Sequence, residues 1–418
     1  MNNPRTLLLV ALFALSYLIW SQWQLDYNPQ AQATTVEDSA TPQPAKPAAS
    51  PPVDDVPEIG KLQSGNAVEA PPLAEATPPT SQPILVTTDV LRVEIDPRGG
   101  SLVSAELLAY PQQQGSSEPV RLLDDEAARY FVAQSGLLSS DGAAPNHQAE
   151  FTTSSRNWTL ANGQNRIEVP LTWQDASGIQ VRKTLVFERG SYVIGMQQQV
   201  RNASAKPWTG QAYRQLQRIP LVLDSSGIKG YTNTERYSFM GAAWYSPEEK
   251  FQKLAFDKFQ GEPLKQTVSG GWVAMLQHYF FAAWIPPANE VDEFSSAQVA
   301  AADGTRYVMR SFSPALSIQP GTEQTFSARL YVGPKLQSTL DDLAPGLSKT
   351  ADYGVFTVIS EPLHWLLSMF HKLTGNWGFA IILLVLLIKA VFFKLSEAQY
   401  RSMAKMRKLQ PRLEQLKE

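Results

Sequence analysis

The sequence predicts a multi-domain membrane protein in which an all-β domain is combined with α-helical transmembrane and interfacial segments. Two long apolar runs, at residues 6–20 and 377–393, are candidates for membrane spans. Between them, from residue 84 to residue 334, short β-rich runs alternate with glycine-containing turns. The chain has no cysteine, which excludes disulfide frameworks, thiolate nucleophiles and Cys-ligated metal sites.

The first predicted element is an N-terminal transmembrane anchor at residues 1–25. Its apolar run carries no charge, and Trp20 and Trp23 suit the membrane interface. A cleaved signal peptide is the alternative, because Ala31-Gln-Ala is a small-x-small site, but this site lies too far from the apolar run for a usual cleavage region. Arg5, before the run, places the N-terminus in the cytoplasm.

Residues 26–83 are predicted to form a disordered, proline-rich tether. Twelve of the 30 prolines lie between Pro29 and Pro83, mixed with Ala, Thr, Gln and Ser. Such a composition cannot bury enough apolar surface to offset the conformational entropy of the chain. We therefore expect an extended linker between the anchor and the first folded domain.

Residues 84–334 are predicted to form one large β domain. Turn signals such as Asn162-Gly163, Ser177-Gly178 and Arg189-Gly190 separate the β-rich runs at short, regular intervals, which is typical of antiparallel hairpins in a sandwich. One helical segment is predicted at residues 247–258. The predicted strands are residues 84–95, 157–160, 166–173, 179–187, 192–200, 271–284, 307–312 and 324–332.

The β domain offers few groups for acid–base chemistry. Its two histidines, His147 and His278, are far apart in the sequence, and His278 lies in a strand pattern that suits a structural role. Its tryptophans are spread through the predicted strands, which favours a core over a sugar-stacking site. We therefore predict no catalytic residue, no metal site and no cofactor in this domain.

Residues 335–374 are predicted to hold a connector and an amphipathic interfacial helix. Leu363, Leu366, Leu367 and Phe370 recur at helical spacing. The segment is too short and too polar to span a bilayer, so we expect it to lie in the interface on the extracytoplasmic side. An ordinary helix packed on the β domain is the alternative.

Residues 375–395 are predicted to be a second transmembrane helix. Its apolar run contains a single charged residue, Lys389. A charge buried at a helix centre costs roughly 2.5–3.5 kcal/mol on insertion scales, so Lys389 is a functional candidate. However, it lies only about 7.5 Å before Lys394 along the helix. Snorkelling to the cytoplasmic headgroups is therefore an alternative of equal weight.

Residues 396–418 are helix-forming and carry six basic and three acidic residues, which places them in the cytoplasm. The neighbouring span, together with Met403 and Met406, favours anionic lipid or protein over nucleic acid as the contact. An excess of basic over acidic residues is also found over the longer C-terminal part of the chain. Residues 26–352 contain 26 basic and 35 acidic residues, whereas residues 353–418 contain 9 and 4. This charge asymmetry suggests two compartments, or an anionic partner for the basic tail.

Three C-terminal features resemble the YidC/Oxa family of membrane protein insertases, in its Gram-negative form with a large periplasmic domain. They are Gly-Asn-Trp-Gly-Phe at residues 375–379, the single cation in the following span, and residues 398–411. Residues 270–280 and the Trp-containing N-terminal anchor resemble the same proteins. The resemblance covers the chain outside the tether. It implies a periplasmic β-supersandwich, followed by an amphipathic interfacial helix, the first helix of a five-helix insertase core and the start of a basic cytoplasmic loop.

The resemblance implies a membrane protein insertase and chaperone, not an enzyme, that inserts and helps fold inner-membrane proteins alone or with the Sec translocon. In such proteins a hydrophilic groove containing a cation admits the polar tail of a substrate, whose apolar segment then partitions into lipid. Lys389 is assigned as this cation, although the family commonly has arginine there. Because the chain ends at Glu418, we expect it to lack most of the insertase core.

The resemblance also implies partners and a location. The expected partners are nascent inner-membrane proteins, the Sec translocon, anionic lipids and, through the cytoplasmic loop, the ribosome or targeting factors, with no nucleic-acid substrate. The expected location is the bacterial inner membrane, as a multi-pass protein with a cytoplasmic N-terminus and residues 26–374 in the periplasm. The residues assigned to the cytoplasmic loop contacts are Arg401, Lys405, Arg407 and Lys408, and those assigned to the interfacial helix are Leu363, Trp365, Leu366 and Phe370.

Two other classes of protein stay open at this point. A membrane-anchored periplasmic carbohydrate- or protein-binding β-sandwich, of a mutarotase-like kind, would need histidine and acidic side chains that converge on a sugar. An assembly scaffold would use the β domain only to bind partners. Neither class explains Lys389 or the basic helix.

Overall fold

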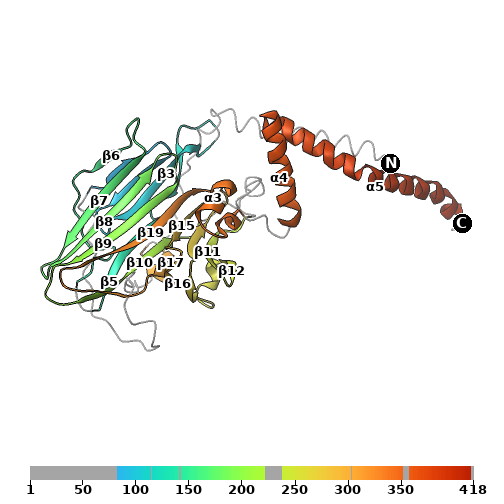
Figure 1. Cartoon of the computed structure of the whole chain (residues 1–418). Coiled ribbons are helices and arrows are strands. Elements are labelled where there is room, and N and C mark those ends of the chain that lie inside the picture. Colours follow the sequence, from blue (N-terminus) through green and yellow to red (C-terminus); the bar gives the residue numbers. More distant parts are fainter. Residues whose placement is uncertain are drawn as a thin grey trace, which may run out of the picture. The chain divides into compact units, whose positions relative to one another are not determined.

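A computed structural model describes residues 82–113, 115–140, 143–221, 238–302, 304–351 and 357–415. The part before residue 352 is a sandwich of two β-sheets, and residues 357–415 form two helices (Figure 1). The predicted N-terminal anchor and nearly all of the predicted tether lie outside the described residues. The coarse prediction of a β-sandwich followed by an apolar helix is confirmed.

The first sheet has 11 strands in the order β13-β16-β17-β10-β5-β3-β2-β1-β6, with β18 beside β10 and β4 beside β3. Its pairs are antiparallel except for the parallel pair of β1 and β6. The strands are β1 Ile84–Thr87, β2 Leu91–Asp96, β3 Ser101–Pro111, β4 Pro119–Leu123, β5 Phe131–Ser139, β6 Asn157–Thr159, β10 Trp208–Arg218, β13 Lys265–Ser269, β16 Val291–Ala301, β17 Gly304–Phe312 and β18 Leu316–Ile318.

The second sheet has 8 strands, all antiparallel, in the order β12-β11-β14-β15-β19-β9-β8-β7. The strands are β7 Arg166–Gln174, β8 Ile179–Glu188, β9 Val193–Asn202, β11 Gly241–Ser246, β12 Lys250–Leu254, β14 Trp272–Leu276, β15 Phe280–Ile285 and β19 Glu323–Pro334. Two short helical pieces follow this sheet, and they are α3 Gln337–Leu343 and the 3-10 helix η4 Leu347–Thr350.

The main hydrophobic core lies between the two sheets. In β7, Ile167, Val169 and Leu171 are buried, whereas Arg166 and Glu168 are exposed, as the alternating pattern predicts. The predicted core role of the tryptophans is confirmed, because four of them are buried and two others pack against the core. The buried ones are Trp208, Trp244, Trp272 and Trp284, and the two partly buried ones are Trp158 and Trp173.

Three sequence predictions in this domain are wrong. The predicted strand at 84–95 is a hairpin of two antiparallel strands, β1 and β2. Residues 247–258 do not form a helix, because residues 250–254 are strand β12, paired with β11, and only a 3-10 turn follows at Phe256–Lys258. The predicted strand at 271–284 is a hairpin of two strands, β14 and β15. Its turn is formed by His278 and Tyr279, across which Gln277 N donates to Phe280 O at 2.9 Å. His278 therefore lies in a turn and not within a strand.

Two buried cations connect the sheets in opposite directions. Lys183, from β8, donates from Nζ to Gly99 O at 2.6 Å and to Ser135 O at 2.9 Å, both on the side of the 11-stranded sheet. Burial lowers the pKa of Lys183 to about 7. Arg214, from β10, donates from Nη2 to Ser327 O of β19 at 3.0 Å. Each cation thus finds acceptors on the opposite sheet, as a buried charge requires.

Arg214 also pairs with two acidic residues, the buried Asp292 and the partly buried Glu290. Its Nη1 lies 2.8 Å from Asp292 Oδ2, and its Nη2 lies 3.0 Å from Glu290 Oε1. Ser311 Oγ donates to Asp292 as well. Burial raises the pKa of Asp292 to about 7, and although Arg214 opposes the rise, the neighbouring Glu290 adds to it. One guanidinium between two carboxyl groups favours keeping a proton on the pair.

We expect the free energy of unfolding of the sandwich to fall as the pH rises from about 4 to about 7, because of Asp292. Folded Asp292, with a pKa of about 7, keeps a proton that the unfolded chain, with a pKa of 3.8, releases. The folded state therefore binds more protons in this window, and stability changes by at most about 1.4 kcal/mol per pH unit. Urea unfolding followed by tryptophan fluorescence measures this slope. Asp292→Asn should flatten it, and an unchanged slope would contradict the assignment.

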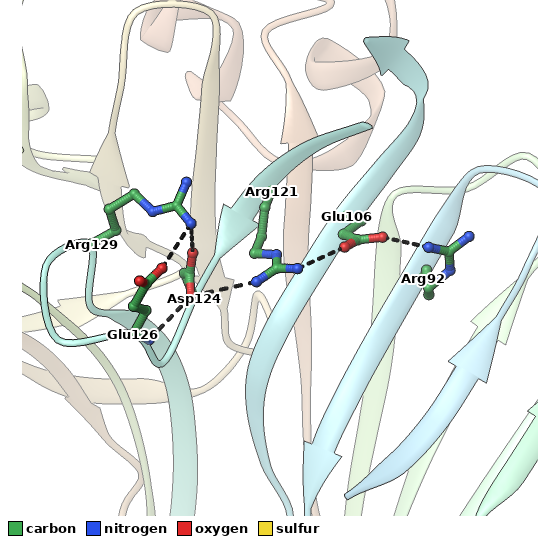
Figure 2. Close-up of polar contacts among 6 residues, drawn as sticks. All are labelled: Arg92, Glu106, Arg121, Asp124, Glu126 and Arg129. Carbon is green, nitrogen blue, oxygen red and sulfur yellow. Dashed lines mark hydrogen bonds and ion pairs between the residues drawn. The ribbon is translucent and has the colours of Figure 1, made fainter. Parts of the chain in front are cut away.

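A second polar network lies over β2, β3, β4 and the turn after β4. Figure 2 shows six side chains of alternating charge, namely Arg92, Glu106, Arg121, Asp124, Arg129 and Glu126. Glu106 lies 2.8 Å from Arg92 and 3.1 Å from Arg121, so it joins strands on both sides of β3. The arginines are well exposed, and each pair therefore adds little stability by itself. We infer a structural role in ordering this part of the sheet.

Candidate functional site

The candidate site is the C-terminal helical pair, which consists of α4 (Thr357–Thr374) and α5 (Trp377–Gln415). The helix predicted from the spacing of Leu363, Leu366 and Phe370 is present as α4. These three side chains are partly covered, in keeping with the contact between α4 and α5. Trp365, by contrast, is 64% exposed, and Leu373 is 80% exposed. The four residues assigned to the interface therefore divide between a partly covered face and an open apolar face.

The turn between the two helices is specified by its sequence. Gly375 has a φ of 65°, which favours glycine, and its N–H donates to His371 O at 2.8 Å, so it ends α4. Asn376 then caps α5, because its Oδ1 accepts from Gly378 N at 2.7 Å. The His371 ring stacks on the Trp377 ring with centroids 3.9 Å apart. This stack and the two caps fix how α5 leaves α4.

Helix α5 is long and apolar enough, over Trp377–Ala404, to cross a membrane. Of its apolar residues that the structure describes, Ala380 is the one that is buried. The helix continues without a break past residue 395 into the basic segment. Its 39 residues rise about 58 Å, roughly twice the thickness of a hydrocarbon core. A bilayer that surrounds the apolar run would leave the basic end outside it.

Lys389 is an exposed cation within the apolar part of α5. It lies nine residues after Ala380, so it points to the opposite side of the helix. The structure gives Lys389 no ion pair and no hydrogen bond to any residue that it describes. Its neighbours one turn away are exposed apolar side chains, namely Val385, Leu386, Phe392 and Phe393. The site is thus a single ammonium group on an open apolar face.

The cytoplasmic cations assigned from the sequence lie further along α5. Arg401 Nη2 lies 2.6 Å from Glu397 Oε1, and Lys394 Nζ lies 3.9 Å from Glu397 Oε2. Both pairs are exposed and contribute little stability. Lys405, Arg407 and Lys408 belong to α5, but their side chains lie outside the described residues.

The two histidines of the β domain lie in different cavities. His147 lines a cavity of about 380 Å³ together with Asp96, and its Nδ1 is 2.6 Å from Tyr213 Oη. Burial raises the pKa of Asp96. His278 lines another cavity, of about 750 Å³. Among the residues that the structure describes, no group of three histidine or acidic side chains is placed to hold a metal ion.

Two features of the structure were not predicted from the sequence, because each is formed by segments that lie far apart in the chain. The Arg214 cluster joins β10, β16 and the residues just before β16, and the cavity of about 750 Å³ joins segments from residue 110 to residue 351. No local pattern marks either of them. The only signal for the cavity was the aromatic run at Tyr279-Phe-Phe, which suits a strand equally well.

A large β-sandwich followed by an amphipathic helix and an apolar helix of spanning length is typical of a membrane protein with a large extramembrane domain. Residues 83–366 match the family model described as YidC periplasmic domain, and residues 369–418 match the model described as 60Kd inner membrane protein. The chain belongs to the YidC family of membrane protein insertases, so the family predicted from its motifs is confirmed.

Similar proteins match along the whole chain. It is 43% identical over 422 residues to a membrane protein insertase YidC of Methylococcus capsulatus, which covers 100% of this chain and 73% of that protein. It is 39% identical over 427 residues to one of Thioalkalivibrio sulfidiphilus, covering 100% of this chain and 74% of that one.

The solved structures that resemble the chain are more distant. A galactose mutarotase related enzyme from Lactobacillus acidophilus has a TM-score of 0.40 and 11% identity, covering 60% of this chain and 97% of that one. A putative aldose 1-epimerase from Escherichia coli K12 has a TM-score of 0.33 and 10% identity, covering 60% of this chain and 98% of that one. At these values the likeness carries no argument about activity.

Proposed function

We propose that the chain acts as a membrane protein insertase and chaperone, which inserts inner-membrane proteins and helps them fold, alone or with the Sec translocon. Family membership along the whole chain supports the insertase activity. The single observation that carries the mechanism is Lys389, a lone cation on an apolar face of α5. A charge that stays in lipid is costly, which makes Lys389 a functional candidate.

In the proposed mechanism, Lys389 faces a hydrated groove and attracts acidic residues in the polar tail of a substrate. The groove lets this tail enter the bilayer without losing all of its water. The apolar segment of the substrate then leaves sideways into lipid, and its partition out of water drives the reaction. No covalent step is involved, and no cofactor is required.

Helix α4 serves this mechanism as an interfacial helix on the periplasmic side. Three of its exposed apolar side chains, Trp365, Met369 and Leu373, recur every four residues and form one face. Tryptophan favours the headgroup level of a bilayer. We assign membrane contact to this face, and we assign the partly covered Leu363, Leu366 and Phe370 to the face that is shielded within the helical pair.

The basic end of α5 is proposed to face the cytoplasm. Arg401, Lys405, Arg407 and Lys408 follow the apolar run, and such clusters next to a span bind anionic headgroups. The same cations are available to the ribosome or to targeting factors. Arg401 is the one of the four whose pairing the structure describes, and its partner Glu397 lies in the same helix.

For topology, we expect residues 84–334 to face the periplasm and both ends of the chain to face the cytoplasm. External protease added to spheroplasts should release fragments of the β domain, while a cytoplasmic control protein stays intact. The arrangement follows from the basic residues that flank the two predicted spans on one side. Full protection of the β domain in intact spheroplasts would contradict it.

The function is tested in a bacterium depleted of its own insertase. The full-length protein should restore insertion of a model inner-membrane protein, which is measured by the protease accessibility of its periplasmic loop. Cells without the added protein give the baseline. A protein that accumulates in the membrane but restores no insertion would contradict the proposal.

A further inference from the structure

The cavity of about 750 Å³ in the β domain is an open, largely apolar groove (called the groove below). Tyr279, at the tip of the β14–β15 hairpin, is 57% exposed, and Leu336, just after β19, is 43% exposed. Phe239, Phe280 and Tyr110, near the end of β3, line the groove as well. Exposed aromatic and apolar side chains gathered in one place mark a contact surface.

The lysines and carboxylates that the structure describes along the groove are of one sign only. Lys253 and Lys335 line it, and Lys253 Nζ lies 5.2 Å from the centre of the Phe239 ring. None of the described residues that line the groove is acidic. Aromatic rings beside lysines are the side chains that favour the headgroup level of an anionic bilayer.

The groove also lies where the chain leaves the β domain for the membrane helices. Thr350 and Ala351 line it, and α4 begins at Thr357, six residues later. Six residues span at most about 20 Å. The wall of the groove is therefore held within about 20 Å of an amphipathic helix that precedes an apolar span. No other part of the sandwich is as close to α4 along the chain.

We propose that the groove docks on the headgroup layer of the bilayer, with Tyr279 and Leu336 inserted among the lipids and Lys253 and Lys335 on anionic headgroups. The occupant is anionic phospholipid. Docking would hold the β domain against the membrane beside the helical pair. The proposal rests on α5 lying in a bilayer, as in the proposed function, but it does not depend on insertase activity.

The test uses the full chain in vesicles. Because the chain has no cysteine, Tyr279→Cys gives a single site for an environment-sensitive fluorophore. The matched control is Gln324→Cys, an exposed position near the start of β19, the strand whose last residue lines the groove. The two positions lie near opposite ends of β19, roughly 30 Å apart along the strand. Vesicles of phosphatidylcholine with an equal part of phosphatidylglycerol carry a quencher on their acyl chains.

We expect the quencher to act on the label at residue 279 and not on the label at residue 324. In the vesicles that contain phosphatidylglycerol, Lys335→Ala should lower the ratio of protein molecules with a docked groove to those with an undocked groove about fivefold. Lys253→Ala should have the same effect. In vesicles of phosphatidylcholine alone, these lysine variants should match the parent. Equal quenching at residues 279 and 324 would overturn the proposal.

Two further outcomes separate the proposal from its alternatives. A chain that floats with the vesicles but shows no quenching at residue 279 would overturn the docking while leaving the membrane placement of α5 intact. A chain that does not float would contradict both. If an apolar model peptide shifts the emission of the label at residue 279 when lipid quenching is absent, the groove binds protein segments and the lipid proposal is wrong.

Discussion

Replacing Arg214 with methionine is expected to lower the free energy of unfolding of the β domain by about 3–5 kcal/mol. The Arg214 side chain is fully buried and lies within 3.0 Å of both Glu290 Oε1 and Asp292 Oδ2. Methionine has a similar length but no charge, so it would leave the buried Asp292 and the partly buried Glu290 without their cation. The loss is measured by urea unfolding of the full chain, followed by tryptophan fluorescence.

Two companion variants show whether charge or volume is responsible. Arg214→Lys keeps the charge but loses the second donor of the fork, so its loss should be smaller than that of the methionine variant. Adding Asp292→Asn to Arg214→Met should recover part of the loss, because one of the two carboxyl groups is then removed. If Arg214→Met costs less than about 1 kcal/mol, the cluster contributes no more than an exposed ion pair.

The Arg214 cluster could not be predicted from the sequence. Arg214 lies more than seventy residues before both Glu290 and Asp292, and each of the three looks like an ordinary exposed charge in the sequence. Strands β5 and β10, which lie side by side in the first sheet, are buried along most of their length on both faces. They have no alternating pattern to read, and neither was predicted.

Strands that cover the core on one face were predicted well. In β7, β8 and β9 the buried residues alternate, and glycines with positive φ at residues 178 and 190 end the strands where expected. The hairpin of β14 and β15 was missed because its turn, His278-Tyr279, contains neither glycine nor proline. For predicting where strands end, the residue types in the turns were therefore as informative as the pattern of hydrophobic residues.

The helical site could be predicted from the sequence because its signals lie within one short stretch of the chain. A glycine followed by asparagine before an apolar run predicts the break between α4 and α5, and one lysine in that run predicts the candidate cation. The groove of the β domain could not be found in this way, because its walls come from β3, the β14–β15 hairpin and the segment around Leu336. Only the fold brings these segments to one place.

Replacing Lys389 with glutamate is expected to give the largest loss of function. In the full-length protein, insertion of a substrate with an acidic tail should fall furthest in Lys389→Glu, because the carboxylate repels the tail. Lys389→Gln should impair the same substrate less, and Lys389→Arg should be tolerated, because the role requires only a cation. A substrate whose tail is neutralised should be affected much less in every variant. Insertion is measured by protease accessibility of the substrate loop.

The alternative account is that Lys389 only snorkels to the cytoplasmic headgroups and marks topology. The matched control is therefore Lys394→Gln, five residues further along α5, where the side chain is 90% exposed. If topology alone matters, Lys394→Gln and Lys389→Gln should behave alike, because each removes one of several cations on the same side. If Lys389 faces a hydrated groove in the membrane, Lys389→Gln and Lys389→Glu should impair the acidic-tailed substrate more than the neutral-tailed one, whereas Lys394→Gln and Lys389→Arg should not. A lysine that stays charged within the membrane needs water nearby. Equal insertion of both substrates by the parent protein and all four variants would leave snorkelling as the better account.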